Sequence, residues 1–509
     1  MTVTVDGGPL TVGEVVAVAH RRTGVELGPG VAARMAPARR VVERALASGA
    51  VVYGITTGFG ALASTRVDSV QSAALQVNLL RSHAAGVGPD LPDELVRAML
   101  LLRARTLAQG YSGTRVEVVE RLLELLRRDL LPVVPGQGSV GASGDLAPFA
   151  HLALPLIGEG QLRVDGQARE ASEALAAVGL EPLQLEPKEG LSLLNGTEGM
   201  LAMGVLALDR AEQLVRAADA ACALAVEALL GSARPFLPEI HSLRPHPGQI
   251  DSAARIARLI DGSEIGKSHS EDFHHAVQDA YSLRCAPQVH GAVLDTLQHA
   301  RSVFERELGS VADNPLVFPD SGEVISGGNF HGQPLAFALD FMGIAITELG
   351  SISERRTDRM LDPQRSSGLP AFLAATPGLN SGYMLAQYTA AALVAENRVL
   401  SHPASVESIP TSGSQEDHVS MGWGAGRKLA QILDNTTRVL AVELLCGVQG
   451  IEQRRPHRPG PGTASICQAI RELVPTLDSD RPIGSEIESV AGLIQSGHID
   501  RAGAMQPNG

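Results

Sequence analysis

Apolar residues recur at helical spacing through most of the chain. From about residue 205 onward, alanine and leucine fill positions i, i+3, i+4 and i+7 of long segments, which predicts helices with one apolar face. These predicted helices lie at 206–230, 288–308, 334–360, 384–400 and 424–453. Acidic side chains interrupt their apolar faces. We therefore expect the core of a helix bundle and no membrane span.

The first 205 residues have a more broken pattern. Their spacing predicts shorter helices at 12–23, 31–47, 70–84, 92–107 and 116–130. The run Leu-Arg-Val-Asp-Gly-Gln at 162–167 predicts a small hairpin. The expected fold is therefore mainly α-helical. We expect residues 1–205 to form a mixed N-terminal region, and residues 206–509 to form a long central helix bundle followed by C-terminal helices.

Composition narrows the class of protein. Hydrophobic residues make up 44% of the 509 positions and aromatic residues only 3%, which suits a helical globular protein. The net charge of −14 argues against a nucleic-acid partner. The N-terminus lacks the pattern of a secretory signal, and the four cysteines are scattered without a CxxC pair. We expect a cytoplasmic protein with reduced thiols and no membrane partner.

One loop has unusual chemistry. Residues 138–148 read Gly-Ser-Val-Gly-Ala-Ser-Gly-Asp-Leu-Ala-Pro, and glycines at this density disfavour a helix by about 1 kcal/mol each. Attack of the Gly144 nitrogen on the Ala142 carbonyl would close a five-membered ring. Loss of the Ser143 hydroxyl would then leave an electrophilic methylidene. The same tripeptide occurs at 47–49, where its glycine is typical of a helix C-terminal cap, so three letters alone favour a turn.

The full sequence of this loop, residues 138–148, resembles the signature of the aromatic amino acid lyases, the histidine and phenylalanine ammonia-lyase family. The resemblance implies that Ala142, Ser143 and Gly144 form the cofactor MIO (4-methylidene-imidazol-5-one). It also implies a long-helix bundle of the ammonia-lyase and fumarase-like type, assembled as a homotetramer with shared sites. Family motifs follow in the same order from Tyr53 to about Ser420.

A second glycine-rich loop carries the expected base. Residues 53–60 read Tyr-Gly-Ile-Thr-Thr-Gly-Phe-Gly and resemble the family motif that contains its essential tyrosine. The resemblance implies that Tyr53 removes the weakly acidic β-hydrogen of the substrate. A phenol with a pKa of about 10 needs nearby positive charge or hydrogen bonds for this role. Without the neighbouring glycines, a tyrosine that braces a loop would be the simpler interpretation.

Other motifs imply residues that bind the substrate. The segment Gln-Asp-Ala-Tyr-Ser-Leu-Arg resembles the family segment in which Arg284 would bind the carboxylate, with Tyr281 and Gln278 assisting. Asn195 matches the asparagine beside the cofactor and substrate. Phe330 matches the aromatic residue over the ring. Taken singly, these residues are also typical of a surface arginine, a turn and a core phenylalanine.

Two positions bear on which substrate is used. His83 occupies the family's selectivity position, where tyrosine and histidine lyases can carry histidine. Glu416 matches the glutamate of histidine lyases, whereas the phenylalanine and tyrosine enzymes generally have an amide. A carboxylate accepts an imidazole N–H, but beside a phenyl ring it would be an unpaired buried charge that costs several kcal/mol. Met384 would form part of the pocket wall. Each residue alone is typical of a polar loop or a core histidine, but together they favour an imidazole.

The sequence therefore predicts a carbon–nitrogen lyase that converts L-histidine to urocanate and ammonia in histidine catabolism. One alternative is a tyrosine or phenylalanine ammonia-lyase, or a 2,3-aminomutase, with the same cofactor. Another is a non-catalytic helical scaffold with an uncyclised loop. We expect no metal, because His269, His274 and His275 lack the helix-face spacing of an HExxH site.

Overall fold

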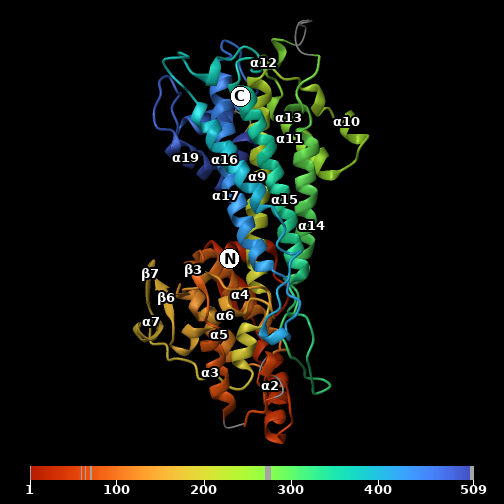
Figure 1. The fold of residues 1–509 in the computed structure, drawn as a ribbon, viewed down its shortest axis with the longest axis vertical. Helices are drawn as coiled ribbons and strands as arrows, with labels where there is room; N and C mark the ends of the chain where they lie inside the picture. The colour runs from red at the N-terminus through yellow and green to blue at the C-terminus, as the bar shows by residue number, and fades with distance from the viewer. Residues whose placement is uncertain (1, 59, 63–64, 69–70, 270–276, 505–509) are drawn as a thin grey trace. The chain divides into compact units, whose positions relative to one another are not determined.

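The computed structural model describes residues 2–58, 60–62, 65–68, 71–269 and 277–504 (Figure 1). The protein is 59% helical, with 20 α-helices in those ranges, so the expected mainly α fold is confirmed. It divides into two compact units. Unit 1 contains Met1–Leu206, Arg301–Asp340 and Pro403–Arg427, and unit 2 contains Ala207–Ala300, Phe341–His402 and Lys428–Gly509. Four of the five divisions fall within long helices, which are α9 (Glu198–Ala228), α14 (Ala286–Glu307), α15 (Gln333–Leu361) and α17 (Gly422–Glu452), and the fifth falls in the loop at His402 and Pro403.

Unit 1 combines short helices with small sheets. Its helices are α1 (Val12–Ala19), α2 (Val31–Ser48), α3 (Ser72–His83), α4 (Asp93–Ala108), α5 (Val116–Arg127), α6 (Leu146–Ala153), α7 (Ala171–Ala177) and α8 (Glu189–Leu194). Leucines and valines on one face of α5 are buried, as its spacing predicts. Gly49 ends α2 with φ +69°, so the expected C-terminal cap at the second Ala-Ser-Gly is confirmed.

The sheets of unit 1 are small. Strand β1 (Thr2–Val5) pairs in parallel with β2 (Gly24–Leu27), and β3 (Val87–Asp90) pairs with β5 (Pro135–Gln137) in antiparallel fashion. A three-stranded sheet has the order β4 (Leu131–Pro132), β6 (Gln161–Val164) and β7 (Gln167–Glu170). Strands β6 and β7 are the hairpin expected from the sequence. Strands β8 (Leu316–Phe318) and β9 (Glu323–Ile325) form another hairpin.

Unit 2 is helical. Besides its parts of the four long helices, it contains α10 (Pro238–Ser242), α11 (Pro247–Ile260), α12 (Glu264–Lys267), α13 (Tyr281–Arg284), α16 (Met384–Leu400), α18 (Pro461–Arg471), α19 (Gly484–Gln495) and α20 (His498–Ala504). Among the described residues, α15 is long and apolar enough to cross a membrane, and 67% of its most apolar window is buried. A core helix passes the same test of length and composition.

The long helix α9 begins earlier than its sequence pattern predicts. The spacing starts the helix at residue 206, whereas the structure starts it at Glu198. The Asp145 carboxylate accepts a hydrogen bond from the Met200 amide at 2.8 Å and so caps the first turn. Because this cap comes from a distant loop, the local spacing contains no sign of it.

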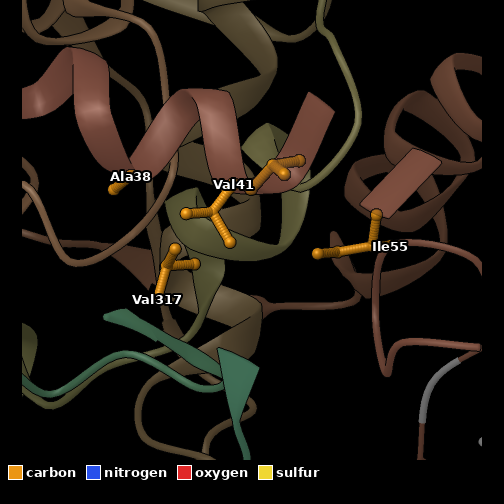
Figure 2. Close-up of a cluster of buried hydrophobic side chains, with 5 residues drawn as sticks. Ala38, Val41, Ile55 and Val317 are labelled. Carbon is orange, nitrogen blue, oxygen red and sulfur yellow. The ribbon is translucent and has the colours of Figure 1, made fainter. Parts of the chain in front are cut away.

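The loop after α2 is anchored by a small apolar core. Ile55 is fully buried against Ala38, Val41 and Val42 of α2 and Val317 of β8. Figure 2 shows Ile55 on its loop beside the helix, with Val317 on the strand below. Burial of one such side chain contributes about 1.5–3 kcal/mol. The loop that contains Tyr53 is therefore anchored to α2 and β8 through Ile55.

Within unit 2, a buried polar network joins four long helices. Asp219 of α9, His290 of α14, Arg356 of α15 and Glu443 of α17 are all fully buried. Arg356 donates from Nε and Nη2 to the two carboxylate oxygens of Glu443, at 2.5 and 2.9 Å. Its Nη1 lies 3.3 Å from Nε2 of His290, whose Nδ1 lies 2.7 Å from Asp219. Since a guanidinium can only donate, Nε2 accepts and Nδ1 carries the proton.

This network fixes the charge of the histidine as well as the packing. Burial lowers the pKa of His290, and the Asp219 carboxylate opposes that effect. The imidazole is therefore neutral at neutral pH, and the charges that remain are paired. Arg356 also donates from Nη1 to the Ser282 carbonyl at 3.3 Å. The network thus supports the short helix α13.

Replacing Arg356 by methionine should destabilise unit 2. The substitution leaves the Glu443 carboxylate buried without its partner, which costs about 3–5 kcal/mol. The matched control is Arg365→Met, because Arg365 forms a partly exposed pair with Asp362 and should shift unfolding little. Urea midpoints of the two variants compare these effects. Equal, small shifts would contradict the structural role assigned to the network.

Candidate functional site

Five of the residues singled out in the sequence meet at one cavity in unit 1. The cavity has a volume of about 120 Å³. It is lined by Tyr53, Gly60, Leu79, His83, Ser143, Leu146, Leu191, Leu194, Asn195, Ser412 and Glu416. These side chains come from five separate segments of the chain. A small, partly apolar cavity with converging polar groups is typical of a ligand site.

The loop that carries Ser143 has a left-handed backbone. Ser143 has φ +50° and Gly144 has φ +84°. A Cβ atom at Gly144 would overlap the carbonyl of Gly196, and the Asp145 amide donates to that carbonyl at 2.8 Å. Only glycine fits at position 144. Ala142 is buried beside it.

Asp145 is a residue whose importance the sequence did not reveal. It is fully buried, and its Oδ2 accepts the Met200 amide at the start of α9. Burial raises its pKa to about 7; Glu198 adds to this increase, while the Met200 amide and Arg103 oppose it. The carboxyl therefore exchanges its proton near neutral pH. The motif alone gives no indication of this environment.

Asn195 is held on two sides. Its Nδ2 donates to the Asn314 carbonyl at 3.0 Å, and its own carbonyl accepts from Arg103 at 3.1 Å. Arg103 is fully buried and also pairs with Glu198 at 2.5 Å. Within the described ranges, Asn195 Oδ1 is buried without a hydrogen-bond partner. An unpaired acceptor at a cavity is suited to an N–H donor from a bound molecule.

Tyr53 lines the same cavity. Its oxygen accepts a hydrogen bond from the Gly60 amide at 3.2 Å. Phe59, part of the same motif, lies outside the described residues.

His83 and Glu416 both line the cavity and interact electrostatically. Burial lowers the pKa of His83, and the Glu416 carboxylate acts in the opposite direction. His83 is therefore neutral at neutral pH. Its Nδ1 lies 3.1 Å from the Ser82 hydroxyl. Glu416 Oε2 accepts a hydrogen bond from the Thr411 hydroxyl at 2.9 Å.

A second group of expected site residues belongs to unit 2. Gln278 and Arg284 line a cavity of about 990 Å³ in that unit. The Arg284 guanidinium lies 4.6 Å from the centre of the Tyr281 ring, and Nε donates to the Asp279 carbonyl at 2.9 Å. Tyr281 is 71% exposed. The two groups of residues therefore occupy different units.

Five expected residues line neither cavity: Ala142, Gly144, Tyr281, Phe330 and Met384. Phe330 is half-buried in unit 1, and Met384 begins α16 in unit 2. His269 lines the larger cavity, whereas His274 and His275 lie outside the described residues. No cluster of histidine, cysteine and acidic residues suited to a metal occurs in the part of the chain that the structure describes.

Comparison with known proteins identifies the family. The model of aromatic amino acid lyases matches residues 10–472. The chain belongs to this family of lyases. The resemblance expected from the loop at 138–148 is therefore confirmed, and this aromatic amino acid lyase can be compared with its relatives along nearly its whole length.

Curated relatives and solved structures agree with that assignment. Histidine ammonia-lyase of Gloeobacter violaceus is 52% identical, covering 97% of this chain and 96% of its own. The Deinococcus radiodurans protein of the same name is 53% identical, covering 97% and 93%. The structure of histidine ammonia-lyase from Trypanosoma cruzi has a TM-score of 0.90 at 41% identity, covering 99% and 95%. Tyrosine aminomutase from Streptomyces globisporus has a TM-score of 0.93 at 42% identity, covering 99% of both chains. The expected ammonia-lyase type of fold is confirmed.

The raised pKa of Asp145 predicts a pH dependence of stability. Between about pH 4 and pH 7 the folded lyase holds a proton that the unfolded chain has lost, so this group lowers stability as pH rises through that window. The slope approaches 1.4 kcal/mol per pH unit. Asp145→Asn removes this titration. Its stability relative to the parent protein should rise from pH 5 to 7 and level off above pH 7, as measured by urea midpoints. A constant difference would contradict the assignment.

Proposed function

We propose that the protein is a histidine ammonia-lyase, which releases ammonia from L-histidine and forms trans-urocanate. The observation that carries the proposal is the meeting of Glu416 and His83 with Ser143 and Tyr53 at one small cavity. The curated histidine ammonia-lyases at 50–53% identity support it. Membership of the family makes the chain a carbon–nitrogen lyase.

We infer that Ala142, Ser143 and Gly144 form the MIO group. The surrounding residues fit this inference, because Gly144 has no room for a Cβ atom and Asn195 offers an unpaired buried oxygen at the same cavity. When formed, the group supplies an electrophile that makes the substrate amine easier to expel. The left-handed backbone at 143 and 144 holds this tripeptide away from regular secondary structure.

Tyr53 is the proposed base. It would accept the β-hydrogen of histidine, a step that requires a positioned proton acceptor. The Gly60 amide donates a hydrogen bond to its oxygen, and Ile55 anchors its loop. Asn195 Oδ1, which is buried without a partner among the described residues, would accept an N–H from the substrate.

Glu416 and His83 would recognise the imidazole. A carboxylate accepts the ring N–H, and a neutral histidine can pair with either ring nitrogen. Beside a phenyl or phenol ring, the Glu416 carboxylate would lose its solvation without gaining a partner on that side. This difference favours histidine over phenylalanine and tyrosine.

Arg284 is the proposed partner of the substrate carboxylate, with Gln278 and Tyr281 beside it. Its planar guanidinium can bind a carboxylate through two hydrogen bonds. We also propose a cytoplasmic homotetramer with shared sites. In unit 2, Phe341 and Ile344 are 43% and 46% exposed beside a shallow apolar cavity of about 650 Å³. Exposed apolar patches of this kind mark interfaces between proteins.

Ser143→Ala should abolish urocanate formation, because the methylidene carbon derives from the Ser143 side chain. Ultraviolet detection of urocanate after addition of L-histidine measures turnover, and intact mass measures the loss of two waters. The matched control is Ser48→Ala in the other Ala-Ser-Gly, at the end of α2, which should change neither. Turnover by the Ser143 variant would refute the cofactor. Product analysis for a β-amino acid separates the aminomutase alternative.

Glu416→Gln should reduce kcat/KM for L-histidine by about 10- to 100-fold, because a charge-assisted hydrogen bond to the imidazole is lost. Phenylalanine turnover, if detectable, should fall less. Steady-state kinetics with both substrates test this. Glu407→Gln is the matched control, because Glu407 is exposed and absent from the cavity lining. Unchanged histidine kinetics in the Glu416 variant would remove the basis for the substrate assignment.

A further inference from the structure

The Glu416 side chain is held by its own turn. Thr411 and Glu416 form an isolated antiparallel bridge, in which the Thr411 amide donates to the Glu416 carbonyl at 2.9 Å. Between them, Ser412, Gly413 and Ser414 all have positive φ angles of +50°, +61° and +66°. Two of these are non-glycine residues in a conformation that is unfavourable for them. The turn is thus strained in a way that brings residues 411 and 416 face to face.

The strained turn creates one specific side-chain contact. The Thr411 hydroxyl donates to Glu416 Oε2 at 2.9 Å, and both side chains are half-buried. A carboxylate has two oxygens, so this bond occupies part of one oxygen and leaves Oε1 for another donor. It also restricts rotation of the glutamate side chain, whose freedom would otherwise be lost on binding.

The same turn is tied to the loop of the proposed base. Ser412 Oγ accepts a hydrogen bond from the Ala61 amide at 3.3 Å. A Cβ atom at Gly60 would overlap that same oxygen, so the two loops approach as closely as a glycine allows. The Gly60 amide donates in turn to the Tyr53 oxygen. The turn that holds Glu416 is therefore connected by hydrogen bonds to the loop that holds Tyr53.

We propose that Thr411 is a positioning residue that determines specificity for an imidazole ring, by holding the Glu416 carboxylate at the angle from which Oε1 accepts the ring N–H. The proposal rests on the role of Glu416 in the proposed function. Binding groups need supporting residues that lock their side-chain rotamers in the productive geometry. Thr411 itself need not touch the substrate.

The test removes the hydroxyl and measures binding of ring analogues. Thr411→Val removes the hydroxyl but keeps the branched shape, and Thr411→Ala removes everything beyond Cβ. Thr411→Ser keeps the hydroxyl and removes only the methyl group. The probes are imidazole-4-propionate and 3-phenylpropionate, which share the carboxylate and differ in the ring. Dissociation constants come from calorimetry, and intact mass reports the two lost waters for each variant. KM and kcat for L-histidine are measured alongside.

In the Thr411→Val and Thr411→Ala variants, the dissociation constant of imidazole-4-propionate and the KM for L-histidine should rise about ten-fold. We expect kcat and the dissociation constant of 3-phenylpropionate to stay within about two-fold of the values of the parent protein. The Thr411→Ser variant should match the parent protein. A merely structural role would weaken both analogues alike. Thr476→Val is the matched control, since the Thr476 hydroxyl donates to Glu452 at 3.1 Å in unit 2 and lines neither cavity. It should change no binding constant.

The outcomes separate the two proposals. If Glu416→Gln weakens imidazole-4-propionate but the Val and Ala variants of Thr411 do not, the positioning role is overturned while the proposed function stands. If Glu416→Gln also leaves the analogue unaffected, the imidazole role of Glu416 fails, and the proposal for Thr411 fails with it. Equal loss of both analogues in the Thr411 variants would likewise overturn the positioning role.

Discussion

The close approach of two glycines organises unit 1. Gly144 lies against the carbonyl of Gly196, and a side chain at Gly196 would overlap the Arg103 guanidinium and the Glu198 carboxylate. This contact presses the Ala-Ser-Gly loop onto the turn before α9. It brings Asp145 to the first turn of that helix and Asn195 to the cavity. One steric constraint, the absence of two Cβ atoms, thus sets the positions of the loop, the helix and the amide.

In each unit, buried ion pairs fix the backbone beside the proposed site residues. In unit 1, Arg103 binds the backbone of Asn195 while it pairs with Glu198. In unit 2, Arg356 binds Glu443 and the carbonyl of α13, the helix that contains Arg284. A buried ion pair adds little net stability over an apolar replacement. Its directional hydrogen bonds nevertheless fix side chains at the accuracy that a binding site requires.

In the proposed function, Glu416 and His83 in the unit 1 cavity select the ring of the substrate. Leucines such as Leu79 and Leu191 would accept any flat ring, so in that proposal the discrimination depends on the polar side chains beside them. Burial keeps His83 neutral, and the Thr411 hydroxyl holds Glu416 on one side. A ring without an N–H would leave that carboxylate unpaired.

The sequence by itself determined most of the longer helices, because apolar spacing is local, but it did not predict shorter ones such as α11 and α18. The helix expected at 384–400 matches α16, and the hairpin at 162–167 is present. The sequence motifs also determined the family. They indicated the residues of the proposed site, whose roles remain predictions. Only the tertiary structure decided which of those residues meet, and that segments 301–340 and 403–427 belong with the first 206 residues. It alone revealed Asp145 as the cap of α9, Arg103 behind Asn195 and Thr411 on Glu416. Hydrogen bonds and burial depend on where the chain places its partners in space, and spacing along the sequence does not contain that information.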